Sequence, residues 1–135
     1  MASDNLDGKL FLVGLGPGDP LLQTPAALAA LKEAAVRIGY RGYIDQGTDL
    51  SEGKELVSME LGQELERAAR AVDLAYDGRI VAVISSGDAG IYGMAGPVFR
   101  VLTDRGWDGE SPPVEVVPGI SALQSAASLL GSPLM

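Results

Sequence analysis

The sequence contains no cysteine and no histidine. Without cysteine the chain has no disulfide bond and no thiol nucleophile, and without either residue it lacks the usual ligands of zinc. The absence of histidine removes the side chain that most often serves as a general acid or base near neutral pH. Any general base in this chain must therefore be aspartate, glutamate, tyrosine or lysine, and we expect no metal site.

Positive charge is also scarce, with 10 lysines and arginines against 18 aspartates and glutamates and a net charge of −8. Binding of nucleic acid or of an anionic membrane normally requires a basic face, so we expect neither partner. No apolar run approaches the roughly 18 residues of a membrane span. The polar start, Met-Ala-Ser-Asp-Asn, lacks the basic and apolar regions of a signal peptide, so we expect a cytoplasmic protein.

Aromatic residues make up only 5% of the 135 residues, so aliphatic side chains and alanine must build the core. This length suffices for one domain with a core of its own. We expect residues 1–8 to form a disordered tail and residues 9–135 to form a single α/β domain. The 18 glycines and 8 prolines predict several loops whose backbone conformation is fixed by these residues.

Short apolar runs alternate with amphipathic helical patterns along the chain. The apolar runs predict strands at 9–13, 36–38, 55–57, 79–84 and 114–117. The helical patterns predict helices that begin at Thr24-Pro25 and that span 63–76, 97–105 and 121–130, with a polar loop over 41–53. Continuous apolar strands between helices indicate a five-stranded, mainly parallel sheet with helices on both faces.

Side-chain spacing also predicts which helical faces are buried and how one helix begins. For the first helix we expect the apolar face Leu28, Leu31 and Ala35. For the helix over 63–76 we expect the face Leu65, Ala69, Val72 and Tyr76, with the charged residues, Arg67 among them, turned elsewhere. Ser121 and Gln124 have the spacing of a capping box at the start of the last helix.

Three of the predicted strands end in unusual loops, at residues 14–20, 85–93 and 118–122. The carboxyl ends of parallel strands share one edge of a sheet, and ligands of open α/β sheets bind beyond that edge. We therefore expect the three loops to form one pocket.

The first loop, Gly-Leu-Gly-Pro-Gly-Asp-Pro, does not fit a dinucleotide site. Asp19 stands where that fingerprint has its third glycine, and a carboxylate there would repel a pyrophosphate. Pro17 removes a backbone N–H that a phosphate cradle needs, and no Walker sequence occurs. Taken alone, this loop is best explained as a tight turn.

The residues of the other loops leave two interpretations open. Asp88 offers an acceptor for ligand hydroxyl or ammonium groups, but it can equally accept N–H groups of its own turn. Ser121 caps a helix whatever else it does. Tyr40 and Tyr43 flank the end of the second strand, where a tyrosine more often contributes to the core than to catalysis.

Taken together, the three segments resemble one known family. They read LVGLGPGDP at 12–20, SSGDAGIYGMAG at 85–96 and VVPGISA at 116–122, and in this order they resemble the tetrapyrrole (corrin/porphyrin) methylases. The resemblance runs from about Lys9 to the end of the chain. It implies S-adenosylmethionine as methyl donor, two α/β domains with the donor between them, and a homodimer. The chain would then be the N-terminal domain, without the C-terminal one.

Motif by motif, the resemblance assigns binding residues and no catalytic residue. The residues that match the donor site are Pro17, Ser86, Gly87, Asp88, Ile91, Ser121 and Ala122. The residues assigned to the substrate side are Gly16, Gly18, Asp19, Tyr40 and Tyr92. Two positions depart from the family: Ala89 stands where proline is usual, and Tyr40 stands where some relatives have an acidic residue.

The wording of the second motif, with GYRGY at 39–43, is most similar to members that methylate carbon 17 of precorrin-3B with ring contraction in cobalamin biosynthesis. Such tetrapyrroles carry many carboxylates, so we expect either local cations, from Arg41 and Lys54, or cations from another domain. Other interpretations stay open: a precorrin-4, precorrin-2 or uroporphyrinogen methylase, a diphthine synthase, or a non-catalytic nucleotide-binding domain.

Overall fold

The computed structural model describes residues 7–40 and 53–134. These residues form an α/β fold around a five-stranded sheet in the order β3-β2-β4-β1-β5, and every pair of neighbouring strands is parallel. The strands are β1 (Lys9–Gly14), β2 (Val36–Tyr40), β3 (Glu55–Met59), β4 (Ile80–Ser85) and β5 (Val114–Val117). The predicted fold class is confirmed, and each predicted strand is present.

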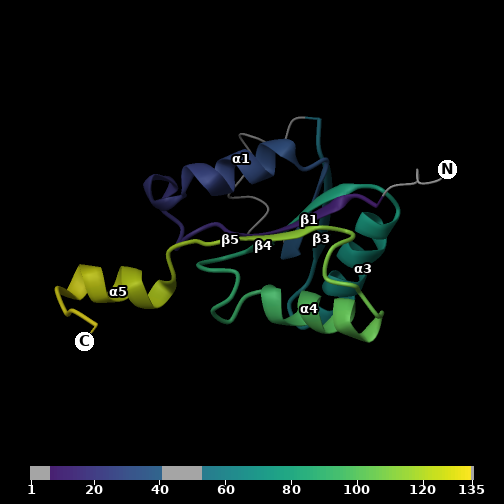
Figure 1. The fold of residues 1–135 in the computed structure, drawn as a ribbon. Coiled ribbons are helices and arrows are strands. Elements are labelled where there is room, and N and C mark those ends of the chain that lie inside the picture. Colours follow the sequence, from purple (N-terminus) through teal and green to yellow (C-terminus); the bar gives the residue numbers. More distant parts are fainter. Residues whose placement is uncertain (1–6, 41–52, 135) are drawn as a thin grey trace.

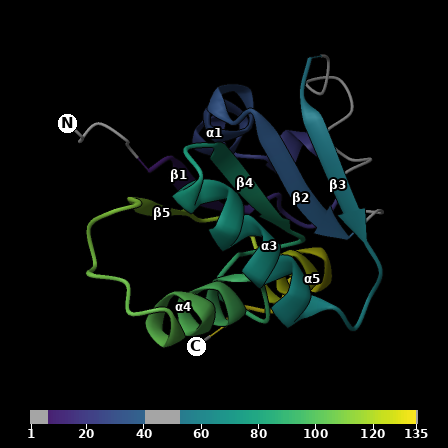
Figure 2. The ribbon, with the colours of Figure 1, turned by 90° about the vertical axis from the view of Figure 1, so that its right-hand side faces the viewer.

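Helices cover both faces of this sheet. The helix α1 (Pro25–Glu33) lies on one face, and α3 (Glu64–Tyr76) and α4 (Ala95–Asp104) lie on the other (Figures 1 and 2). A short 3₁₀ helix, η2 (Pro20–Leu22), precedes α1. No helix of the described part is long and apolar enough to cross a membrane. All but the last residue of the loop predicted over 41–53, and most of the predicted tail, lie outside the described residues.

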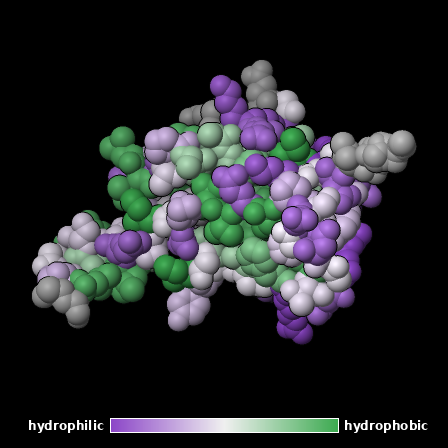
Figure 3. All heavy atoms as spheres, in the orientation of Figure 1, coloured by the Kyte–Doolittle hydropathy of each residue, from purple (hydrophilic) through white to green (hydrophobic). Residues whose placement is uncertain are grey.

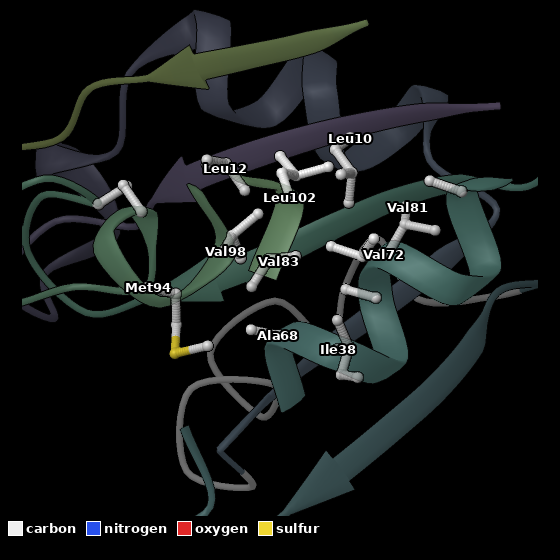
Figure 4. Packing of buried hydrophobic residues seen from close by; sticks show 14 of the residues in the cluster. Leu10, Leu12, Ile38, Ala68, Val72, Val81, Val83, Met94, Val98 and Leu102 are labelled. Atoms are coloured by element: carbon white, nitrogen blue, oxygen red, sulfur yellow. The ribbon is translucent and has the colours of Figure 1, made fainter. Parts of the chain in front are cut away.

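The central strands β1 and β4 are buried on both faces, which explains their continuous apolar sequences. Leu10 and Leu12 face α3 and α4, where they belong to a cluster with Val72, Val98 and Leu102 (Figure 4). The alternate residues of β1, Phe11 and Val13, pack with α1 on the opposite face. Aliphatic residues and alanine dominate both clusters, as the low aromatic content predicts.

The buried face of α3 differs from the prediction. The residues fully buried against the sheet are Ala68, Ala71, Val72 and Ala75, whereas Leu65 is 48% exposed. Small side chains allow the helix to approach the sheet closely, so the contact runs along alanines rather than along the larger apolar residues.

A similar correction applies to two of the three residues predicted for the buried face of α1, whereas Leu31 is buried as predicted. There Ala27, Ala30 and Leu31 are buried, whereas Leu28 is 37% exposed and Ala35 lies beyond the end of the helix.

The last helix, α5 (Ala122–Leu130), begins and ends as predicted but packs on neither face. The Ser121 hydroxyl accepts the Gln124 N–H, the Gln124 side chain accepts the Ser121 N–H, and Gly131 ends the helix at φ +66°. None of its residues is buried. It extends past the carboxyl edge of the sheet (Figure 1), and hydrophobic atoms lie on its surface (Figure 3). The expectation of helices on both faces is therefore met by α1, α3 and α4 alone.

Candidate functional site

The three loops meet at the carboxyl edge of the sheet, because β4, β1 and β5 are adjacent strands. Gly16 and Gly87 exchange two backbone hydrogen bonds, of 3.0 and 2.8 Å, which join the first loop to the second. The Gly119 N–H donates to Asp88 Oδ1 at 2.9 Å, which joins the third loop to the second. The expectation that the loops lie together is confirmed.

Backbone packing without side chains holds the centre of this arrangement, which we call the glycine junction (Gly14, Gly87 and Gly119). A Cβ atom on Gly119 would lie 2.3 Å from Gly87 O and 2.6 Å from Gly14 O. A Cβ atom on Gly14 would lie 2.5 Å from Gly87 O. Real Cβ atoms do not approach oxygens so closely, so Gly14 and Gly119 must be glycines for the loops to meet.

The carboxylate of Asp88 anchors the site. Its Oδ1 accepts the Gly119 N–H, and its Oδ2 accepts the Gly90 N–H at 2.9 Å. The interpretation of Asp88 as an acceptor for local N–H groups is therefore confirmed. Each carboxylate oxygen has a further lone pair, so these bonds leave acceptor capacity for a ligand.

The far end of the second loop is fixed as well. The Met94 N–H donates to the buried Ser85 Oγ at 2.9 Å, and a Cβ atom on Gly93 would lie 2.5 Å from Ala89 O. Between these points Tyr92 has φ +56°, a left-handed conformation that is rare outside glycine, and its side chain is fully exposed. Such backbone conformations persist where the surroundings enforce them, often at binding sites.

A pocket of about 540 Å³ opens between the second and third loops, and we call it the donor pocket because the resemblance assigns most of its lining residues to the methyl donor. It is lined by Ser86, Gly87, Asp88, Ile91, Tyr92, Ser121, Ala122 and Leu123. The structure thus brings together all the residues assigned to the methyl donor except Pro17, and it adds Tyr92 from the substrate set. Leu123 was not predicted.

The remaining assigned residues do not line this pocket. Pro17 is half-buried, and Gly18 and Asp19 are exposed on the first loop, where Asp19 Oδ1 accepts the Leu21 N–H and so caps η2. Tyr40 is half-buried at the end of β2. The expectation that the three loops form one pocket is therefore only partly met, because the second and third loops line this pocket and the first loop supports it through Gly16.

A smaller pocket of about 120 Å³, which we call the Arg67 pocket, adjoins the donor pocket. It is lined by Leu61, Glu64, Arg67, Ser85, Ser86, Tyr92, Gly93 and Met94. Ser86 and Tyr92 line both pockets. Arg67 is only 4% exposed, so its expected place away from the buried face is wrong. The available signal was its helical spacing, four residues before Ala71 and eight before Ala75, which places it on the same face of α3 as these alanines.

One of the two expected cations of the cleft, Lys54, does not lie at this edge. Lys54 precedes β3, so it lies at the amino edge of the parallel sheet, and its Nζ donates to the Lys32 carbonyl. Arg41 lies outside the described residues. Among the described residues, Arg67 from α3 is a cation that lines a pocket at the loop edge.

Comparison with known proteins gives the relationship. The model of the tetrapyrrole (corrin/porphyrin) methylases matches residues 9–135. The chain belongs to this family. It is 46% identical over 131 residues to a cobalt-factor III methyltransferase of Priestia megaterium. The matched region covers 96% of this chain and 24% of the relative. The family resemblance inferred from the three motifs is thereby confirmed.

Solved structures of the family share this fold. The crystal structure of the methyltransferase CobJ superposes with a TM-score of 0.83 at 38% identity, over 94% of this chain and 52% of that one. A uroporphyrin-III C-methyltransferase from Thermus thermophilus, solved with S-adenosyl homocysteine, has a TM-score of 0.68 at 32% identity, over 89% of this chain and 52% of that one. The chain therefore spans about half the length of these structures.

Proposed function

We propose that this protein binds S-adenosylmethionine in the donor pocket and methylates a carbon of a precorrin in cobalamin biosynthesis. The observation that carries the proposal is the donor pocket itself. The motifs assign residues from two separate segments, 86–91 and 121–122, to the donor, and residues of both segments line this one pocket. The relative solved with S-adenosyl homocysteine supports the choice of donor.

The residues of the pocket fit such a ligand. A volume of about 540 Å³ lies within the range of sites for cofactors and small molecules. Gly87 presents backbone without a side chain, Asp88 keeps free acceptor lone pairs for hydroxyl or ammonium groups, and the 50% exposed Ile91 offers an apolar surface. The combination of apolar contact and a few polar groups suits an adenosine with an amino-acid end.

The chemistry suits a chain that has neither histidine nor cysteine. An acceptor carbon supplies the electron pair of a new carbon–carbon bond while the bond from methyl carbon to sulfur breaks, and the sulfur leaves with that bond's electrons as a neutral thioether. Because the leaving group is already activated, the protein must mainly align the reactants and exclude water. The rigid second loop, fixed at Gly87 and at Met94, is suited to that alignment.

The finer assignments are part of the same proposal. The motif wording favours carbon 17 of precorrin-3B, with ring contraction, and the relative in Priestia megaterium is named for cobalt-factor III. A cofactor cleft between two domains, a homodimer and a cytoplasmic location remain predictions from the resemblance and the composition.

The test is binding followed by turnover in the protein at its full natural length. Calorimetry with S-adenosylhomocysteine should show one site per chain, and methyl transfer should be measured separately with precorrin-3B, cobalt-factor III and precorrin-4. Transfer to precorrin-3B or cobalt-factor III supports the assignment. Transfer only to precorrin-4 would mean that precorrin-4, and not precorrin-3B or cobalt-factor III, is the substrate. The absence of donor binding would favour a non-catalytic domain.

A further inference from the structure

Arg67 is a buried cation that has few acceptors. It is 4% exposed, its Nη1 donates to the Glu60 carbonyl at 2.9 Å, and its Nη2 lies 3.7 Å from the sulfur of Met94. Its Nε is buried and has no hydrogen-bond partner. Glu64 Oε1 lies 3.8 Å from Nη2, beyond hydrogen-bond length, and that carboxylate side chain is 49% exposed.

This arrangement costs free energy unless another group completes it. Buried charges in proteins are normally paired and fully hydrogen-bonded, because each unsatisfied N–H loses its bonds to water. A guanidinium has five N–H groups in a fixed plane, and its best partner is a carboxylate or phosphate that accepts two of them. Arg67 has one oxygen acceptor and one sulfur contact.

The Arg67 pocket places this cation beside the proposed reaction site. Ser86 and Tyr92 line both this pocket and the donor pocket, so a ligand in one can extend into the other. The volume of about 120 Å³ is too small for an adenosine or a tetrapyrrole, but it accommodates one small charged group. Among the described residues the Ser86 hydroxyl forms no hydrogen bond, so it is available to a ligand in the pocket that Arg67 also lines.

We propose that the Arg67 pocket binds a carboxylate of a ligand in the donor pocket, with Arg67 as its cation. The inference rests on the proposed function, which offers two sources of this chemistry. One is the α-carboxylate of the methyl donor, and the other is a carboxylate arm of the tetrapyrrole. Both would give Arg67 the charged acceptor that the described residues do not provide at hydrogen-bond length.

Glu64 distinguishes the two sources. Hydrogen bonds from its own backbone N–H and from that of Gly62 are the main causes that lower the pKa of Glu64, so its carboxylate is ionised at neutral pH. An amino-acid end brings an ammonium group that this carboxylate attracts. A carboxylate arm brings no cation and is repelled by Glu64. Glu64→Gln should therefore weaken binding of an amino-acid end, and leave binding of an arm unchanged or stronger.

The experiment compares Arg67→Met with the wild type and with Arg70→Met in the protein at its full natural length. Arg70 is an exposed arginine on the same helix, so it controls for net charge. Calorimetry uses S-adenosylhomocysteine, methylthioadenosine, which lacks the amino-acid end, and the accepted tetrapyrrole. Loss of a charge-assisted hydrogen bond predicts an affinity at least about tenfold lower for the ligand whose carboxylate is bound.

Either of two results supports the inference. Weaker binding of S-adenosylhomocysteine with unchanged methylthioadenosine assigns the pocket to the donor. Weaker binding of the tetrapyrrole with unchanged S-adenosylhomocysteine assigns it to a substrate arm. If the wild type binds S-adenosylhomocysteine and the tetrapyrrole, and Arg67→Met binds each of them as tightly as the wild type does, the inference is overturned while the proposed function stands. If the wild type binds no S-adenosylhomocysteine, the proposed function fails, and the inference then fails too unless tetrapyrrole binding depends on Arg67.

The melting temperature distinguishes the proposed ligand-binding role of Arg67 from a purely structural role, which predicts a lower melting temperature in Arg67→Met. The proposed role predicts the opposite. Replacing an incompletely paired buried charge with an apolar side chain of similar length is often neutral or stabilising, so Arg67→Met should keep or raise the melting temperature. Arg67→Lys, which restores the charge, should recover part of the affinity. A lower melting temperature in Arg67→Met, with no recovery in Arg67→Lys, would overturn the inference.

Discussion

The second loop has two sides that differ in how they are held. On one side Gly87 packs against Gly14 and Gly119 so closely that no Cβ atom fits on either neighbour. On the other side Ile91 is 50% exposed, and Tyr92 projects fully into solvent. Both sides belong to one short segment between β4 and α4.

The difference shows how the chain can build a rigid surface from a loop. Backbone hydrogen bonds and glycine contacts fix the path of the segment on the sheet side, so the exposed side chains are carried on a support that does not depend on them. Stability and ligand binding should therefore separate, with stability determined by the sheet side and affinity determined by both sides.

The largest expected effect comes from filling the glycine junction. In Gly119→Ala the new methyl group meets the oxygens of Gly87 and Gly14, so the loops must separate. We expect a loss of about 3 kcal/mol in the free energy of unfolding and no measurable donor binding. Gly96→Ala is the control, because a Cβ atom there meets nothing within 4 Å and the position is helical. It should be neutral or slightly stabilising in denaturant titration. Equal stability of the two variants would contradict the packing argument.

A smaller effect is expected where a side chain, rather than backbone, joins the loops. Asp88→Ala removes the acceptor of two N–H groups, and we expect a loss of about 1.5–3 kcal/mol in the free energy of unfolding. Donor affinity should fall as well, because the third loop is no longer tied to the second.

The matched control for this prediction is Asp108→Ala. Asp108 likewise accepts two N–H groups, from Glu110 and Ser111, but in a turn whose residues line neither the donor pocket nor the Arg67 pocket. Hydrogen bonds from Ser111 and Glu110 lower the pKa of Asp108, so its contribution to stability should fade as the pH falls through that lowered value. Equal donor affinity in the two variants would show that Asp88 has no particular role at the site.

The sequence predicts the elements of this fold well where local signals are strong. Thr24 with Pro25, and Ser121 with Gln124, mark helix starts that the structure confirms atom by atom. The continuous apolar runs of β1 and β4 predict strands buried on both faces, because only such strands tolerate apolar residues in every position.

The sequence predicts packing less well, because packing depends on what lies opposite. Leu65 satisfies the helical periodicity of α3, yet the sheet lies against Ala68 and Ala71, whose small side chains permit a close approach. The burial of Arg67 follows from the same shift of the buried face of α3. Predicting the wrong face therefore also missed that Arg67 lines a pocket beside the loops. The start and end of α5 follow from its capping residues, whereas nothing in its own sequence indicates that none of its residues is buried.

The candidate site was predictable to the extent that it depends on topology. Parallel strands place their following loops at one edge, which brings Ser86 and Ser121 together although they are distant in sequence. The sequence did not predict which loop residues line the pocket. Pro17 and Ile91 are equally suited to contact a ligand by sequence, but only Ile91 lines the pocket, because the first loop is bonded through Gly16 to the backbone of the second.

The smallest effect on stability is expected on the exposed side of the second loop. Tyr92 is fully exposed at φ +56°, and asparagine adopts this conformation more readily than tyrosine does. Tyr92→Asn should therefore change the free energy of unfolding by no more than about 0.5 kcal/mol, in either direction. Tyr92 lines both pockets, so under the proposed function this change should still weaken S-adenosylhomocysteine binding in calorimetry. Unchanged affinity at unchanged stability would mean that the exposed side of the loop does not contact the ligand, whereas a large loss of stability would mean that the two sides of the loop are not held separately.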